Sequence, residues 1–543
     1  MKKTILPLIS FLGSFSTLFS QQRTIGLTVY DNNHRKGYHL LSPMVSGATK
    51  SYLIDDCGRV VKSWTGSGMP GTACILGHDG SLIRTKNIVN NFMALGNGGQ
   101  IEKYDWNDNL IWSFKLSDSN ENLHHDIYEI PNGNILALVW ERHSADEAEV
   151  LGRTFPLGRT DILSERIIEI QPIDKDSFEI VWQWRLWDHM VQNTSSSMPS
   201  YGEASDHPEL MDINFYEASD IGRDWWHLNG ISYNEELDQI IITSRSLGEM
   251  YIIDHSTNML QAAGHSGGRW GKGGDILYRW GNPAAYGRGL KTDQRLFVPH
   301  HAHWIPNGYP NGGKILVFNN GDGRPQGNYS TVEMIDPAMN MSKEYILNTG
   351  EPYGPVASVV KYEAPRPTDF YAPVVSGSYM LKNGHLYTTW GTKGKVFETD
   401  STGKIVWQYI NPFCNTGLQN QGSTPGINTV FRYEFYEPDF SGFQGKNLSP
   451  GKELELNPNP SRLCDLASIS DYKPQPRYIY PNPAKNIVHV KGTTGEARIY
   501  DLAGRLKTIG DSSSISLEGI DPGVYLVETG VGNEKHRDKL IVN

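Results

Sequence analysis

The sequence has few cysteines and no excess of positive charge. Its 543 residues include four cysteines, and none of them forms a CxxC pair. Lysine and arginine together number 49 against 60 acidic residues, which gives a net charge of −11. Such a chain has no general attraction for nucleic acid or for an anionic membrane. An anionic substrate therefore requires a local basic site.

The cysteines Cys57, Cys74, Cys414 and Cys464 leave two alternatives open. An oxidising compartment permits the bridges Cys57–Cys74 and Cys414–Cys464. Isolated small buried thiols explain the same residues equally well. Because four cysteines can pair in more than one way, the sequence alone does not decide the connectivity.

Long apolar runs are absent after the N-terminus. No later stretch approaches the roughly 18 consecutive apolar residues that span a bilayer, so no transmembrane segment is expected. Residues 1–20 combine Lys2 and Lys3 with an apolar run from Ile5 to Phe19, a pattern typical of a signal peptide. The mature protein is therefore expected to be exported, either secreted or at the cell surface.

A phosphate-binding loop is absent as well. The motif GxxxxGK[ST] does not occur, and GATKS at residues 47–51 contains only its second half. The sequence thus predicts no nucleotide and no other cofactor.

One phrase recurs along the middle of the chain. It consists of an acidic residue, a turn and an apolar strand that usually ends in Trp. Four clear copies and two weaker ones occur at 54–64, 104–114, 172–184, 252–280, 334–347 and 399–409. Tight turns between strands, repeated about seventy residues apart without helical periodicity, favour radially arranged sheets. We predict an all-β fold, a six-bladed β-propeller over roughly 40–455 within a domain at 21–460; a stacked sandwich is the competing fold.

The last seventy or so residues differ in kind from this repeat. Short segments of alternating apolar and polar residues, separated by Gly, Asn and Pro, predict a small C-terminal β-sandwich. The phrases YPNPA, IYDLAGR, GVYLVE and KLIVN resemble the type A sorting domain of the type IX secretion system. The resemblance covers 475–543, with a linker at 461–474, and implies the type IX machinery as a partner.

Three histidines occupy one position of the repeat. His125, His227 and His300 each lie six residues before a Pro or Tyr that is followed by Asn. Equivalent positions of different blades lie on one ring about a propeller axis, so three imidazoles are expected to face a common cavity. His301 is the strongest competitor to His300.

Clustered neutral imidazoles suit either a metal site or nucleophilic and acid–base chemistry. The first alternative is a metal-dependent hydrolase or oxidase. The second needs a cation for an oxyanion, and Arg245, at the end of the apolar strand IIITSR, offers a planar guanidinium that matches sulfate. We assign no metal.

The segments HHDIYEIPNGN, DWWHLNGISYNEELDQIIITSR and HHAHWIPNG resemble the bacterial arylsulfotransferases that do not use 3′-phosphoadenylyl sulfate. The resemblance runs from about Tyr52 to Glu455. It implies a sulfotransferase in which a histidine is transiently sulfated. By motif, His300 matches the nucleophile, and His125, His227, Asn229 and Arg245 match residues around the sulfuryl group.

This sequence departs from the family at the nucleophile. The family commonly has Gln-His-Asp, whereas here Pro299, His300 and His301 occur. His301 is therefore also a candidate substrate-binding residue. The expected reaction is ping-pong transfer from an aryl sulfate to a phenol. A surface propeller that binds sulfated compounds or glycans without turnover is the alternative outside enzymes.

Overall fold

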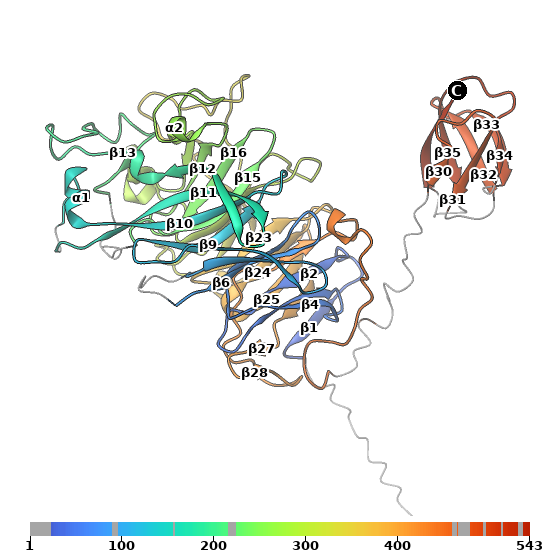
Figure 1. Cartoon of the computed structure of the whole chain (residues 1–543), viewed down its shortest axis with the longest axis horizontal. Helices are drawn as coiled ribbons and strands as arrows, with labels where there is room; N and C mark the ends of the chain where they lie inside the picture. The colour runs from blue at the N-terminus through green and yellow to red at the C-terminus, as the bar shows by residue number, and fades with distance from the viewer. Residues whose placement is uncertain are drawn as a thin grey trace, which may run out of the picture. The chain divides into compact units, whose positions relative to one another are not determined.

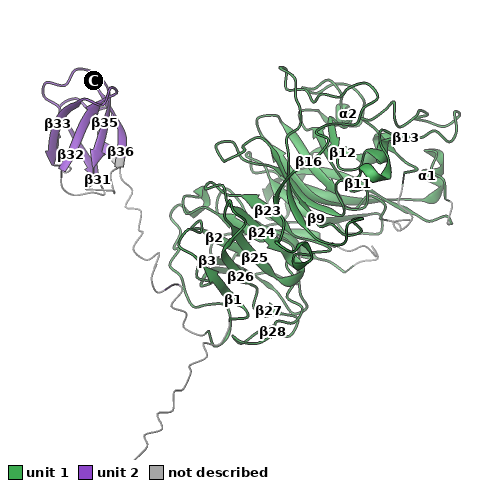
Figure 2. Ribbon diagram, turned by 180° about the vertical axis from the view of Figure 1, so that it is seen from behind, with its two compact units in different colours: residues 1–461 green, residues 462–543 purple. Residues whose placement is uncertain are grey.

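The computed structural model describes residues 23–89, 96–155, 158–215, 224–458, 464, 478–491, 496–511, 514–529 and 536–543. The chain divides into two compact units, residues 1–461 and 462–543 (Figure 2). The signal peptide expected at 1–20 lies outside the described residues. No helix in the described ranges is long and apolar enough to cross a membrane.

The described strands of the first unit form six antiparallel sheets of four or five strands (Figure 1). From the inner strand outward, the first two are β29-β2-β3-β4 (Glu434–Tyr436, Tyr38–Leu41, Lys50–Asp55, Val60–Thr65) and β5-β6-β7-β8 (Pro70–Leu76, Leu82–Asn87, Gly99–Tyr104, Leu110–Lys115). The next two are β9-β10-β11-β12 (Glu121–Glu129, Ile135–His143, Ile162–Asp174, Ser177–Arg185) and β15-β16-β17-β18 (Leu228–Asn234, Gln239–Ser244, Glu249–Asp254, Tyr278–Trp280). The last two are β19-β20-β21-β22 (Pro299–Trp304, Ile315–Asn319, Thr331–Ile335, Val359–Tyr362) and β23-β24-β25-β26-β1 (Gly377–Met380, Leu386–Trp390, Lys395–Thr399, Ile405–Ile410, Gly26–Tyr30).

Helices are short in the described part of the chain. They are α1 (Ala145–Val150), α2 (Met259–Ala262) and the 3₁₀ helices Leu186–Asp188, Pro283–Tyr286, Lys291–Asp293, Pro367–Asp369, Gly391–Lys393 and Ser441–Phe443. Two further strand pairs lie outside the sheets, β13-β14 (Met190–Val191, Met211–Asp212) and β27-β28 (Phe413–Cys414, Gly417–Leu418). The chain is therefore almost entirely β, as its patterning predicts.

The repeated phrase forms the hairpin between the third and fourth strands of a sheet in its clear copies. Its tryptophan packs between neighbouring sheets, and each indole N–H donates a hydrogen bond to the next sheet or the segment that follows it. The pairs are Trp64 to Asp105 O, Trp112 to Ser177 O, Trp182 to Thr257 Oγ1, Trp280 to Pro355 O and Trp407 to Asp56 O. Trp407 of the last sheet returns to the first sheet, and β23 of the last sheet contacts β19 and β20 of the fifth, so the six sheets follow one another in a ring. This arrangement is that of a β-propeller.

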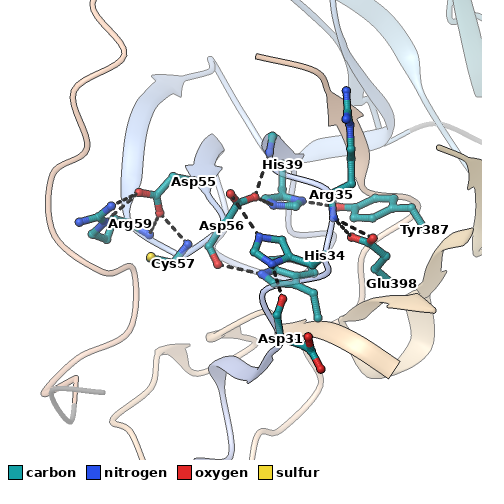
Figure 3. A network of polar contacts seen from close by, with 12 residues as sticks. Asp31, His34, Arg35, His39, Asp55, Asp56, Cys57, Arg59, Tyr387 and Glu398 are labelled. Carbon is teal, nitrogen blue, oxygen red and sulfur yellow. Dashed lines mark hydrogen bonds and ion pairs between the residues drawn. The ribbon is translucent and has the colours of Figure 1, made fainter. Parts of the chain in front are cut away.

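The two ends of the first unit join the first and last sheets. β1 pairs with β26, and β29 pairs with β2. A buried polar network lies at this junction, where Asp56 contacts both His34 and His39 at 3.4 and 3.2 Å (Figure 3). His39 also reaches the Tyr387 hydroxyl of β24 at 2.9 Å. The innermost strands β5, β9, β15, β19 and β23 contact one another in order around the axis.

The cysteines do not form the bridges considered from the sequence. Cys57 and Cys464 are disulfide-bonded, whereas Cys74 and Cys414 are buried free thiols. Both of the considered pairs, Cys57–Cys74 and Cys414–Cys464, are therefore wrong. Burial raises the pKa of the Cys74 thiol to about 11, which keeps it protonated and unreactive at neutral pH.

The second unit contains two antiparallel sheets. They have the orders β30-β31-β34 (Tyr478–Tyr480, Ile487–Lys491, Ile515–Ser516) and β33-β32-β35-β36 (Leu506–Asp511, Glu496–Asp501, Gly523–Thr529, His536–Val542). Their inner faces bury one apolar cluster that includes Val488, Ile499 and Val527. This is the small sandwich that the alternating segments predict.

Candidate functional site

The inner strands of three sheets carry histidines in an unusual backbone conformation. His125, His227 and His301 have φ angles of 48°, 50° and 52°, in the left-handed region that residues other than glycine rarely adopt. The strand pairing of β9, β15 and β19 shifts register beside them. Such strain is found at functional sites, where a bulge redirects a side chain.

The backbone register does not match the sequence register at β19. Spacing to the following Pro or Tyr aligns His300 with His125 and His227. The backbone conformation that His125 and His227 share, however, belongs to His301. His300 pairs with Phe318 one residue before the bulge. Spacing alone therefore does not select His300, and the case for it rests on where its side chain lies.

The side chains of His125, His227 and His300 come together beside Arg245. The rings of His125 and His227 have centroids 4.6 Å apart. Burial, together with the charges of His227 and Arg245, lowers the pKa of His300 to about 3 despite its hydrogen bond to Asn320. Burial also lowers the pKa of His125, with contributions from His227, His300 and Arg245 among others. The imidazoles of His125 and His300 are consequently neutral at pH 7.

The environment of His300 selects one tautomer. Asn320 donates from Nδ2 to the carbonyls of Ala372 and Val375, at 2.6 and 3.0 Å. Its Oδ1 therefore faces Nδ1 of His300, 2.7 Å away, and accepts the Nδ1–H hydrogen bond. Nε2 then carries the lone pair, which accepts a hydrogen bond from the Val375 N–H at 3.2 Å. His300 thus presents an unprotonated Nε2.

His125 is the inner end of a buried chain of three titratable groups. Its Nδ1 lies 2.8 Å from Nδ1 of His124, and Nε2 of His124 lies 2.9 Å from Oε2 of Glu165. The His124 ring stacks on Trp140 with centroids 4.1 Å apart. Burial raises the pKa of Glu165 well above its usual value and lowers that of His124 to about 3. A proton in this chain is therefore held by the carboxyl group rather than by an imidazolium.

His227 has a carboxylate partner of its own. Oδ2 of Asp224 lies 2.5 Å from its Nδ1. Burial raises the pKa of Asp224, but the charge of His227 and this hydrogen bond outweigh burial and lower it. Asp224 is thus ionised, which fixes the His227 ring with Nδ1 protonated.

Arg245 supplies the positive charge of the site. It directly follows β16, and its backbone N–H donates to the carbonyl of His227 at 3.0 Å. Within the described part of the chain, its half-buried guanidinium has no ion pair or side-chain hydrogen bond. A guanidinium beside the neutral imidazoles of His125 and His300 can bind an anion.

Two other predicted residues, Asn229 and His301, have different surroundings from the clustered histidines. Asn229 is fully buried, donates to the Pro299 carbonyl at 2.8 Å and accepts from the Thr243 hydroxyl at 2.6 Å. It therefore joins β15 to β16 and to the residue before His300. The His301 ring stacks on His303, 4.4 Å away, and lines a separate cavity of about 600 Å³.

The cavity beside His301 is not lined by the clustered histidines His125, His227 and His300. Tyr379, Arg432 and Glu434 line it together with His301. Burial lowers the pKa of His301 far below its usual value, and the nearby charge of Arg432 lowers it further. His300 and His301, although adjacent, therefore have different surroundings.

Sequence reasoning missed Glu165, Asp224 and Asn320. Glu165 interrupts the apolar strand ILSERIIEI. Asp224 begins the segment DWWHLN, and Asn320 ends the segment ILVFNN. That interruption is the only signal available, and it does not reveal which histidine each residue contacts.

Comparison with known proteins gives two family matches. A family model described as "Arylsulfotransferase (ASST)" matches residues 44–413, and one described as "Secretion system C-terminal sorting domain" matches 478–543. A sorting domain of this kind implies export and a secreted or surface location.

Two relatives are named "Arylsulfate sulfotransferase AssT". The protein from Lelliottia amnigena is 29% identical over 176 residues, 30% of this chain and 27% of the relative. The one from Escherichia coli O6:H1 is 29% identical over 166 residues, 28% of this chain and 25% of the relative. The chain therefore matches about a quarter of the length of either relative.

Among solved structures, the β-propeller domain of Myceliophteria thermophila Cps50 (Swd1) aligns with 73% of this chain and 90% of its own. The TM-score is 0.36 at 8% identity. Because the family model spans most of the propeller and all of the clustered histidines, the chain belongs to the arylsulfotransferase family.

Proposed function

We propose that this protein transfers sulfuryl groups from aryl sulfates to phenols through His300. The observation that carries the proposal is the fixed tautomer of His300, whose lone pair on Nε2 lies in a cluster with the guanidinium of Arg245, which has no ion pair to any described residue. A neutral, oriented imidazole is a nucleophile at neutral pH. No nucleotide takes part in the proposed reaction.

In the first half-reaction, Nε2 of His300 attacks sulfur. The S–Nε2 bond forms while the bond between sulfur and the aryl oxygen breaks. Arg245 binds the sulfuryl oxygens, and the Val375 N–H, released from Nε2, becomes available to donate to one of them. His227, held by Asp224, packs against the ring of His125 and orients it. In the second half-reaction a phenol oxygen attacks the sulfohistidine and restores Nε2.

The leaving phenolate needs a proton, and His125 is positioned to supply it. With Glu165 protonated, its O–H donates to Nε2 of His124, Nδ1–H of His124 donates to Nδ1 of His125, and Nε2 of His125 carries a hydrogen. Transfer of that hydrogen to the phenolate is balanced by one proton shift along each link, which leaves Glu165 ionised. The acceptor phenol returns the proton in the second half-reaction.

This relay keeps both imidazoles neutral before and after each transfer. Burial disfavours an imidazolium at His124 and at His125, so storage of the proton on Glu165 avoids the costly species. His125 is thus the proposed general acid and base. His124 and Glu165 act through it as positioning and proton-storing residues.

The direct test measures turnover of a chromogenic aryl sulfate with and without an added phenol. We expect phenol-dependent release of the chromophore and parallel double-reciprocal plots, the pattern of ping-pong kinetics. Equal turnover without phenol identifies water as the acceptor. Saturable binding of the sulfate with no turnover indicates a binding propeller and contradicts the proposal.

Replacement of Glu165 by Gln tests the relay. Gln keeps an oxygen for the Leu228 N–H, which Glu165 accepts at 2.8 Å, and an N–H for His124, but it cannot release a proton. We expect kcat to fall about 10–100-fold for sulfates of weakly acidic phenols and little for nitrophenyl sulfates, whose leaving groups need no proton. The measurement is the dependence of kcat on leaving-group pKa.

Glu169→Gln is the matched control, because Glu169 lies in the same strand and pairs with a different histidine, His255. It should leave that dependence unchanged. An equal slowing of all donors by Glu165→Gln indicates a structural role and argues against the relay.

A further inference from the structure

A second cluster of histidines, unrelated to the proposed reaction, lies beside the glycine-rich insertion of the fourth sheet. His189 follows the 3₁₀ helix Leu186–Asp188, and His265 and Asp275 lie in the segment between α2 and β18. One ligand atom of each residue lies within 4.8 Å of the others. The proposed sulfuryl transfer uses none of the three.

Two imidazole nitrogens converge on the same carboxylate oxygen. Nδ1 of His189 lies 2.8 Å from Oδ1 of Asp275, and Nδ1 of His265 lies 2.7 Å from the same atom. The other nitrogen of His189, Nε2, lies 2.9 Å from the carbonyl oxygen of Ala262. A carbonyl can only accept, so Nε2 of His189 carries the hydrogen.

This assignment leaves an electrostatic conflict inside the cluster. A neutral His189 with hydrogen on Nε2 directs the lone pair of Nδ1 at the lone pairs of Asp275. A positive charge between the two atoms removes the repulsion, either as a second proton on His189 or as a metal ion. A histidine that binds a metal through one nitrogen and donates the other N–H to a backbone carbonyl is the common arrangement in metalloproteins.

The surroundings favour the metal ion over the proton. His189 and the carboxyl of Asp275 are buried, and the His189 ring lies parallel to the Trp184 ring, so two ligands are held in place. His265 is 59% exposed, which leaves an entry path and room for a water molecule as a further ligand. Two imidazoles, one carboxylate and an open position are the ligand set of many zinc sites.

We propose that His189, His265 and Asp275 bind a zinc-type divalent metal ion that clamps the glycine-rich segment to the connection that follows the third sheet. A tetrahedral ion with ligands about 2.0 Å away separates its ligand atoms by about 3.3 Å. The ligand atoms must therefore move apart by about half an ångström from their present spacing. The exposed His265 can make this adjustment. Gly274, next to Asp275, has no room for a side chain, because a Cβ there would lie 2.0 Å from the Ala262 oxygen.

The clamp has a structural consequence. Trp184 donates to the Gly274 carbonyl at 2.7 Å, so the segment that carries Asp275 also packs against the third sheet. A metal ion that joins His265 to His189 fixes the glycine-rich segment, whose many glycines otherwise favour the unfolded state through their conformational freedom. The ion is expected to stabilise the propeller rather than take part in turnover.

The test uses the full chain purified without a polyhistidine tag, stripped with a chelator and titrated with Zn²⁺. We expect one equivalent to bind below micromolar concentration and to raise the unfolding temperature by about 3 °C. Co²⁺ in place of Zn²⁺ should give the visible absorption of a tetrahedral site. His265→Ala should abolish these effects. Because the side chain of His265 is exposed, this variant should fold as the wild type does.

His207→Ala is the control, because His207 is also partly exposed and contacts a carboxylate, Glu209, at 3.1 Å. This variant should bind the metal as the wild type does. Failure of the wild type to bind Zn²⁺ below micromolar concentration overturns the proposal, as does unchanged binding by His265→Ala. Either result assigns the positive charge of the cluster to a proton on His189.

Discussion

Replacement of His300 by Ala is expected to reduce phenol-dependent turnover of an aryl sulfate by at least about 10⁴-fold. The side chain supplies the only proposed covalent bond to sulfur, and no neighbouring imidazole shares its orientation. His125 donates or accepts through His124, and His227 is bound to Asp224. The measurement is kcat for the purified variant, with the unfolding temperature recorded to show that the fold persists.

The covalent intermediate gives a second readout of the same prediction. Wild-type protein mixed with aryl sulfate and no phenol should gain the mass of one sulfuryl group on the peptide that contains His300. His301→Ala is the matched control, because His301 is adjacent in sequence but stacks on His303 and lines the cavity of about 600 Å³. This control should still form the adduct. A label on His301, or full activity of His300→Ala, contradicts the assignment.

The fold could be predicted from the sequence because its repeat has a direct physical meaning. Each clear copy is an outer hairpin whose tryptophan bridges to the next sheet, as Trp64 and Trp407 do. The copy at 334–347 lacks the Trp, and there the fourth strand β22 begins only at Val359. Disulfide bonding could not be predicted, because it depends on which cysteines approach in space rather than on their spacing.

The candidate site was predictable only in part. Spacing identified His125 and His227, and the strand ending in Arg245 identified the cation. The residues that set protonation, Glu165 and Asn320, come from neighbouring strands or strand ends and contact the histidines across the sheet. No local pattern links them to their partners. The distinction between His300 and His301 likewise required the structure, because the bulge of β19 gives the two adjacent side chains different surroundings.

Acidification should destabilise the protein strongly, because the propeller buries neutral histidines. The pKa of His300 is lowered to about 3 and that of His303 to about 4, in both cases chiefly by burial. Those of His124, His125 and His301 are lowered for the same main reason. Each of these groups recovers its ordinary pKa of about 6.5 on unfolding.

Below that value the unfolded chain binds protons that the folded chain does not. The stability that these five histidines contribute is therefore present above about pH 6.5 and is lost progressively as the pH falls. Each loses about 1.4 kcal/mol between about pH 7.5 and pH 5.5. Several other groups act in the opposite sense, among them His34, His255, Glu165 and Glu249. Asp238 and Glu169, against the effect of burial, raise the pKa of His255 to about 9, and burial raises that of Glu165.

We expect each of the five lowered pKa values to reduce the free energy of unfolding by about 1.4 kcal/mol across this interval, offset in part by the groups whose pKa is raised. Denaturant unfolding at a series of pH values measures it. His303→Asn removes one of the five groups and should make the dependence on pH shallower by about one proton. Nδ1 of His303 donates one long hydrogen bond to the His301 carbonyl at 3.3 Å, and among the described residues His303 has no hydrogen bond or ring contact with His125, His227 or His300, so the substitution leaves the proposed site intact. A pH dependence that His303→Asn leaves unchanged would contradict the burial of a neutral His303.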